Sequence, residues 1–210
     1  TDSIRFKIGM EYNYINSVND SKTYNFNTTD QIYSDLNVFQ SNYTTSTQNS
    51  ITPKAGIRFE KYKFAVDINS SSTIVQYDNF SNYLNQGTDL NKKYILPNLS
   101  GQIRYKIDRS KTLTTRYNYS VSLPSSNQLL PVVNLSNPLN TITGNPDLKP
   151  NEKHSANINY RNFDFRTRSG YNIYANADFY ASEIITSSIY DVDRKRKTTY
   201  ENISGTYSIS

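Results

Sequence analysis

The feature that most constrains the fold is a two-residue alternation of apolar and polar side chains along most of the chain. From Ile4 to Tyr14 every even position is apolar or aromatic, whereas the odd positions from Arg5 to Asn13 are charged, polar or glycine. Successive side chains of a β-strand point to opposite faces, so this period is typical of a strand with one apolar face. No segment shows a comparable helical period. The sequence therefore predicts an all-β protein.

The same alternation predicts about eight consecutive strands. They cover residues 3–16, 36–59, 62–75, 98–107, 112–123, 152–160, 170–189 and 198–210. The phase is unclear near Val38 and Phe39, where we expect a β-bulge. At least two of these strands exceed the 3–10 residues usual in globular proteins.

Charged residues fall on only one side of this alternation. Val66 and Ile68 flank Asp67, and Ile103 precedes Arg104, but no charge occurs at the apolar positions of the regular strands. Burying an isolated charge is costly, so the apolar face must meet either a protein core or lipid.

The lengths of the connections favour lipid. Short connections are expected at residues 60–61, 108–111 and 162–169. Long ones are expected at 17–35, 76–97 and 124–151, and a hairpin tip at 190–197 shares their end of the sheet. Bacterial outer-membrane barrels combine short periplasmic turns with long extracellular loops. A soluble sandwich or small barrel usually has short turns at both ends. We therefore predict an antiparallel transmembrane β-barrel segment, with outer-membrane lipid against its apolar face.

Composition agrees with a barrel and argues against catalysis. Mean hydropathy is −0.72 and only 35% of residues are hydrophobic, as expected if the second face of each strand lines water. There is no cysteine, and His154 is the only histidine. Carboxylates such as Glu11, Asp67 and Asp178 are scattered, and no pair has the spacing of a general acid and base. We expect no enzyme activity, no metal and no cofactor. The basic run from Asp193 to Thr199 is interpreted as a solvated hairpin tip rather than a nucleic-acid contact.

One loop motif carries a family resemblance. The stretch SNPLNTITGNPDLKPNE, residues 136–152, holds Pro138, Pro146 and Pro150 between two strands. It resembles the Gly-Asn-Pro-x-Leu-Lys-Pro-Glu motif of TonB-dependent outer-membrane receptors, with Asn151 as an extra residue before Glu152. The wider run from Arg116 to Tyr160 and the stretch YENISGTYSIS resemble the related outer-membrane β-barrel family of Bacteroidota. The resemblance covers residues 34–210 and, more loosely, the start of the chain.

The resemblance implies a 22-stranded barrel that imports an iron chelate, a glycan or a peptide. It also implies a plug domain and a contact with periplasmic TonB, both N-terminal to Thr1, and a surface lipoprotein is a further candidate partner. We expect residues 1–210 to be one partial barrel domain of a longer protein, without the plug and the remaining strands. A passive porin, a barrel that anchors surface proteins and a soluble β-rich adhesin stay open as alternatives.

Two sets of loop residues are candidates for function. The family motif comprises Asn137, Pro138, Leu139, Asn140, Gly144, Asn145, Pro146, Leu148, Lys149 and Pro150. The candidate ligand-facing residues are Asn127, Gln128, Leu129, Leu130 and Asn134. The first set stiffens an extracellular loop, since proline lowers the entropy that is lost on ordering it. The second belongs to a stretch from Pro124 to Pro146 that carries no charge.

Overall fold

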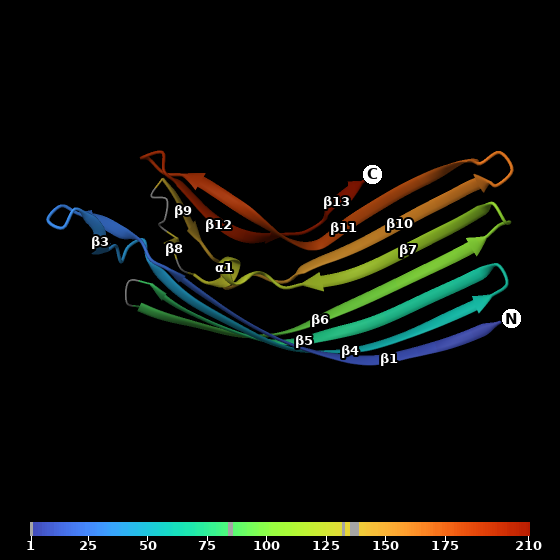
Figure 1. Cartoon of the computed structure of the whole chain (residues 1–210), viewed down its shortest axis with the longest axis horizontal. Coiled ribbons are helices and arrows are strands. Elements are labelled where there is room, and N and C mark those ends of the chain that lie inside the picture. The colour runs from blue at the N-terminus through green and yellow to red at the C-terminus, as the bar shows by residue number, and fades with distance from the viewer. Residues whose placement is uncertain (1, 84–85, 132, 135–138) are drawn as a thin grey trace.

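The chain forms one large, strongly curved antiparallel sheet (Figure 1). The computed structural model describes residues 2–83, 86–131, 133–134 and 139–210. Seven strands lie side by side in chain order, which confirms the all-β meander. They are β1 (Ser3–Ser21), β4 (Asn42–Lys61), β5 (Phe64–Tyr83), β6 (Gln86–Lys106), β7 (Lys111–Ser122), β10 (Asn151–Asp164) and β11 (Ser169–Tyr190). The described residues do not close this sheet into a barrel, so it has the form of an open trough.

An eighth position in the wall is shared by two short strands. β12 (Arg196–Ile203) pairs with the outer half of β11, and β13 (Thr206–Ile209) pairs with β11 between Ala177 and Tyr180. Between them Gly205 has a φ of 79°, a left-handed conformation that glycine adopts without strain, and its N–H donates to the Tyr180 carbonyl at 2.9 Å. The predicted strand 198–210 is thus present but interrupted.

Smaller elements occupy two of the connections. β2 (Tyr24–Asn27) and β3 (Ile32–Leu36) form a separate two-stranded ribbon between β1 and β4. Between β7 and β10 the chain forms α1 (Ser126–Leu129), β8 (Val133–Asn134) and β9 (Asn140–Thr143). β9 runs parallel to β12 and extends the sheet there. No helix in the described part of the chain is long and apolar enough to cross a membrane.

The predicted division into two ends is confirmed. The turns at residues 62–63, 107–110 and 165–168 lie at one end of the trough, and the β2–β3 ribbon and the tip at 191–195 lie at the other (Figure 1). The first turn lies two residues later than expected, because Lys61 still pairs with Phe64 and Tyr62 takes the left-handed conformation, with φ 46°.

Several predicted boundaries were wrong. Most of the expected loop 76–97 is strand, since β5 and β6 pair from Phe64–Tyr105 to Tyr83–Gln86. β1 likewise continues to Ser21, which shortens the expected loop 17–35. The expected start of a strand at residue 36 is wrong, because the segment around Val38 and Phe39 is a turn rather than a bulge and β4 begins at Asn42. Beyond the apolar band, polar residues such as Gln76, Asp78 and Lys93 occupy the face that is apolar elsewhere, so the alternation disappears although the backbone ladder continues.

Cross-strand register brings the two kinds of side chain into continuous faces. One row joins Phe59, Val66 and Ile103 on β4, β5 and β6. The adjacent row joins Arg58, Asp67 and Gln102 on the same strands. We call the first the apolar face and the second the polar face. Within residues 51–59, 66–74 and 95–103 of these strands, every charged side chain lies on the polar face, as predicted; beyond this band β6 carries Lys93 on the apolar face.

The turns are staggered relative to these rows. The row that ends β4 and begins β5, Lys61 with Phe64, continues through Tyr105 and Leu113 to Tyr160 of β10. β10 then runs four residues further, to Asp164, before its turn, since 164 − 160 is 4. Because the turns lie at one end of the trough, the hydrogen-bonded rows run obliquely and the strands are tilted, as closure of a barrel requires.

Candidate functional site on the polar face

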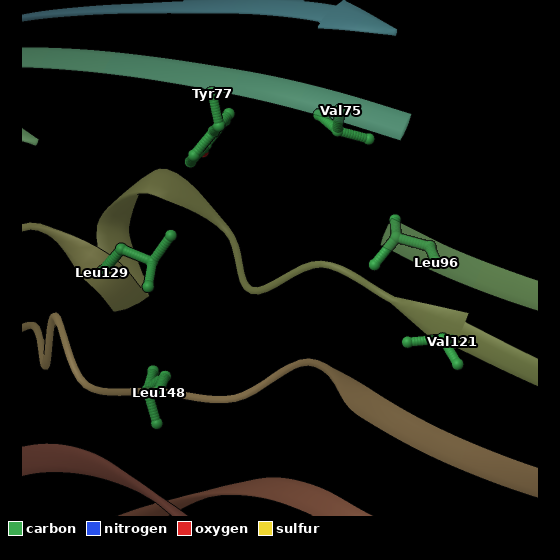
Figure 2. Close-up of a cluster of buried hydrophobic side chains, with 6 residues drawn as sticks. All are labelled: Val75, Tyr77, Leu96, Val121, Leu129 and Leu148. Carbon is green, nitrogen blue, oxygen red and sulfur yellow. The ribbon is translucent and has the colours of Figure 1, made fainter. Parts of the chain in front are cut away.

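The connection between β7 and β10 folds against the polar face instead of projecting from it. Its Leu129 and Leu148 are 0% and 3% exposed and join Val75 and Tyr77 of β5 in one cluster (Figure 2). Leu96 and Val121 complete this cluster. A fully buried leucine contributes about 1.5–3 kcal/mol of hydrophobic stabilisation, so the two leucines anchor the segment. We call residues 123–150 the inserted loop.

Polar contacts fix the inserted loop to strands on both sides of the trough. The Tyr77 hydroxyl donates to Ser126 Oγ at 2.8 Å, and Lys92 Nζ of β6 donates to the Pro146 carbonyl. On the far side, Asn145 Nδ2 donates to the Tyr200 carbonyl of β12 at 2.9 Å. The loop therefore bridges β5 and β6 to β12, across the open side of the trough (Figure 1).

Contacts explain the residue types of the Gly-Asn-Pro-x-Leu-Lys motif. A Cβ on Gly144 would lie 2.1 Å from the Leu130 carbonyl oxygen, so only glycine fits there. Asn145 donates its N–H to the Gln128 carbonyl at 2.6 Å and accepts the Asp147 N–H on Oδ1 at 2.9 Å. Gly144 and Asn145 therefore hold the loop in place.

Lys149 and the start of the motif attach to β12. Lys149 donates its N–H to Asn202 Oδ1 at 2.8 Å, and Asn202 Nδ2 returns a bond to the Lys149 carbonyl at 3.0 Å. The Leu139 carbonyl accepts the Arg196 N–H at 2.9 Å, and Asn140 Oδ1 accepts the Thr198 hydroxyl at 3.2 Å. Pro150 is half-buried directly before β10. Asn137 and Pro138 lie outside the described residues.

The candidate ligand-facing residues separate into two groups. Leu129 and Leu130 are 0% and 4% exposed, so their side chains contact the protein rather than open solvent. Asn127 is exposed, and Gln128 accepts the Ser125 N–H on Oε1 at 2.9 Å. Asn134 lies in β8, paired with Ile142. Ligand capture by this loop stays a prediction.

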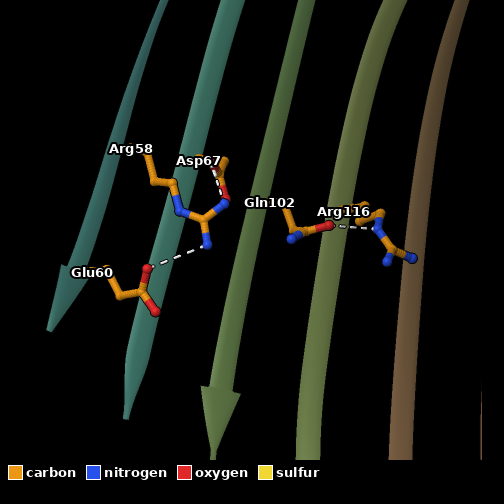
Figure 3. A network of polar contacts seen from close by, with 5 residues as sticks. All are labelled: Arg58, Glu60, Asp67, Gln102 and Arg116. Atoms are coloured by element: carbon orange, nitrogen blue, oxygen red, sulfur yellow. Dashed lines mark hydrogen bonds and ion pairs between the residues drawn. The ribbon is translucent and has the colours of Figure 1, made fainter. Parts of the chain in front are cut away.

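Below the inserted loop, the polar face is a network of charges and amides. Arg58 contacts Glu60 at 3.3 Å and Asp67 at 3.7 Å, and Arg116 Nε donates to Gln102 Oε1 at 2.7 Å (Figure 3). Arg58, Asp67, Gln102 and Arg116 come from four adjacent strands, β4 to β7, and form one row of the register, whereas Glu60 lies two residues further along β4. Such cross-strand pairs give an ordered polar wall rather than a packed core.

A hollow of about 670 Å³ lies on this face, between the charged row and the inserted loop. Lysines border it, and asparagines and serines line it; the residues that the polar face contributes include Lys7, Lys54, Asn69, Asn98, Asn118, Ser120 and Lys153. The sequence pattern predicted the face of each of these residues. It did not predict that they meet, because the register between strands depends on where the turns fall, and the first turn lies two residues later than expected.

The groups considered for catalysis are dispersed. His154 lies on the apolar face, where its Nδ1 is 2.8 Å from the Tyr117 hydroxyl and its ring is 4.7 Å from that of Tyr119. Within the described ranges no group of three His, Cys, Asp or Glu side chains is placed to hold a metal ion. Asp178 of the polar face is bonded to Ser155 and Lys153, at 2.6 and 3.0 Å.

Comparison with known protein families yields a match that covers the whole chain. A family model described as "Outer membrane protein beta-barrel family" matches residues 1–210. No curated protein and no solved structure matches. The curved antiparallel sheet with an apolar band on one face agrees with this family description. The chain therefore belongs to the outer membrane protein β-barrel family and is located in the bacterial outer membrane.

Proposed function

We propose that this wall belongs to a TonB-dependent transporter that imports a nutrient across the outer membrane. The observation that carries the proposal is the inserted loop, which bridges β5, β6 and β12 above a polar hollow. A loop fixed across the trough in this way narrows the passage through the barrel at one end. Transport through a narrowed passage requires an energy-dependent step that opens it. The role is non-catalytic, and the nutrient is an iron chelate, a glycan or a peptide.

The resemblance of residues 144–150 to the receptor motif supports the energy source. It makes periplasmic TonB the proposed partner, reached through a part of the protein outside residues 1–210. A surface lipoprotein is the proposed second partner, at the end that carries the β2–β3 ribbon. A passive porin and a barrel that only anchors surface proteins are the competing roles, and the experiment below separates them.

Uptake by cells that carry the full-length gene tests the energy requirement. A deletion strain would be compared with wild type on single carbon, nitrogen or iron sources until one growth defect is found. Uptake of that nutrient should stop when TonB is depleted or a protonophore is added. Uptake that continues at the wild-type rate without TonB would instead indicate a porin. Growth that is identical with and without the gene on every source would favour an anchoring role.

A further inference from the structure

The hollow on the polar face has binding groups that the protein itself does not use. Within the part of the chain that the structure describes, the side chains of Asn69, Ser100 and Asn118 have no hydrogen-bond partner, although all three line the hollow. Amides both donate and accept hydrogen bonds, and hydroxyls do the same. Such a floor suits a ligand that carries several hydroxyl groups.

One free cation stands at the edge of this floor. Lys54 is paired with Glu11, and Lys153 with Asp178 at 3.0 Å, so both charges are largely compensated. Lys7 lines the same hollow and has no ion-pair partner among the described residues. An uncompensated ammonium favours an anionic ligand, because charge-assisted hydrogen bonds are about twice as strong as neutral ones.

The floor is also shaped to stay open. Gly56 lies opposite Asn69 in the register, and a Cβ there would be 2.4 Å from Asn69 Oδ1. Glycine at this position leaves room for the amide of Asn69. A second hollow, of about 210 Å³, shares Asn69, Ser100 and Asn118 and continues towards Arg116.

We propose that this hollow binds a hydroxylated anion, a sugar or small polyol that carries a carboxylate or phosphate group, with Lys7 contacting the anionic group. The inference rests on the proposed transport function, since it names the substrate class that the wall would recognise. Asn69, Ser100 and Asn118 bind the hydroxyl groups, and the pairs Lys54–Glu11 and Lys153–Asp178 border the site without competing for the anion.

Binding to the full-length protein, purified in detergent, tests this without any energy source. Isothermal titration would compare three probes of similar size: glucuronate, glucose 6-phosphate and glucose. At least one anionic probe should bind about tenfold more tightly than glucose, and its affinity should fall between 0.05 and 0.5 M salt. The stronger of the two anionic probes identifies the acidic group as carboxylate or phosphate.

Variants assign the effect to Lys7. Lys7→Gln should weaken the anionic probe about tenfold and leave glucose unchanged, whereas Lys7→Arg should retain binding. Lys93→Gln is the matched control, because Lys93 is exposed and pairs with Gln76 in a row of the apolar face. Equal affinity for glucose and both anions, no binding of any probe, or an unchanged Lys7→Gln protein would overturn the proposal. A protein that binds the anion without TonB-dependent uptake would overturn only the proposed function.

Discussion

At the scale of single residues, the turns depend on one repeated device. An Asp or Asn side chain accepts the N–H of the residue two positions on, at Asp108, Asp164 and Asp191 among others. These bonds satisfy backbone donors that the strand ladder no longer reaches. They also fix the position of each turn and, through it, the register of the following strand.

The surroundings of Gly144 in the inserted loop leave no room for a side chain. Gly144→Ala places a Cβ against the Leu130 carbonyl and should destabilise the protein by about 1–3 kcal/mol, as overpacking does. The thermal midpoint of the full-length protein measures the loss. When protease is added to intact cells, cleavage of the protein within residues 123–150 should also increase. Gly101→Ala is the control, since nothing lies within 4 Å of its Cβ, and an equal loss in both variants would contradict the steric explanation.

Asp108 should make the turn at residues 107–110 sensitive to acid. The N–H of Ser110, at 2.7 Å, and that of Lys111, at 2.9 Å, stabilise the carboxylate and lower the pKa of Asp108. A lowered folded-state pKa gives a stabilisation that is complete above the unfolded value of about 3.9 and lost as pH falls through the folded one.

Asp108→Ala should therefore lower the thermal midpoint at pH 7, with a smaller difference from wild type at pH 3. Asp193→Ala removes an exposed carboxylate whose ion pair with Lys195 is 3.8 Å long, and it should have little effect at either pH. A difference between Asp108→Ala and wild type that is constant with pH would show that charge plays no part.

At the scale of strands, the alternation of apolar and polar residues predicted the structure reliably only in the band whose apolar face meets lipid. It located every strand of the wall and, within the regular stretches such as Ile4 to Tyr14, the face of each side chain. It failed above the apolar band, where the adjacent residues Asp78 and Asn79 continue β5 with a polar side chain on each face. Pro53 and Pro97 also lie inside long strands, and the β4–β5 register shows no pairs for Thr52 and Pro53. At these positions the other backbone hydrogen bonds of the strand compensate for the N–H donors that proline lacks.

Arginine on the apolar face should impair assembly. Ile103→Arg or Val66→Arg sets a cation against lipid, at a cost of about 2–4 kcal/mol near the bilayer midplane. The amount of folded protein in outer-membrane fractions measures the defect. Arg104→Ile changes the adjacent, polar-face position and should reduce the yield less. Equal yields of all three variants would mean that the faces are misassigned.

The site was predictable only in part. The motif at residues 144–150 stands out in the sequence, because glycine and proline restrict the backbone there. Its partners, such as Tyr200 and Asn202, are more than 50 residues away, and only the fold brings them near. The hollow gave no local signal, since Asn69, Ser100 and Asn118 are ordinary polar-face residues in a chain rich in asparagine and serine.

The tip of the inserted loop can be tested separately from its anchors. Residues 131–138 would be replaced by a Gly/Ser linker of equal length, which keeps Leu129, Leu139, Gly144 and Leu148. Surface abundance should stay normal, and growth on the transported nutrient should fall if the tip takes part in capture or gating. Normal abundance with normal growth would exclude the tip from transport. Leu148→Ala serves as the control for the anchors. It should lower the free energy of unfolding by about 2–5 kcal/mol and thereby reduce surface abundance.

At the scale of the whole molecule, the described residues form a wall with two open edges. β1 pairs only with β4, so its other edge carries free backbone groups in this structure. Unpaired backbone is not tolerated in lipid, so we expect another strand to pair with that edge in the membrane. The number 22 stays a prediction from the resemblance.

The orientation of the wall can be measured on intact cells. Asp30→Cys and Asp193→Cys lie at the end with the β2–β3 ribbon and should react with a membrane-impermeant maleimide. Arg109→Cys and Arg166→Cys lie in the turns at the opposite end and should react only after the outer membrane is permeabilised. Labelling of Arg109→Cys in intact cells would reverse the orientation.

The stagger of the turns has a consequence for anything that moves along the polar face. Across the wall the same row lies four residues further from the turns on β10 than on β5. At about 3.3 Å per residue along a tilted strand, this is a difference in depth on the order of 10 Å. A molecule that slid from Lys153 towards Asn69, keeping to one groove between rows, would therefore also descend. The rows of the wall are therefore inclined to the plane of the membrane, and movement around the wall from β10 to β5 is also movement across the membrane.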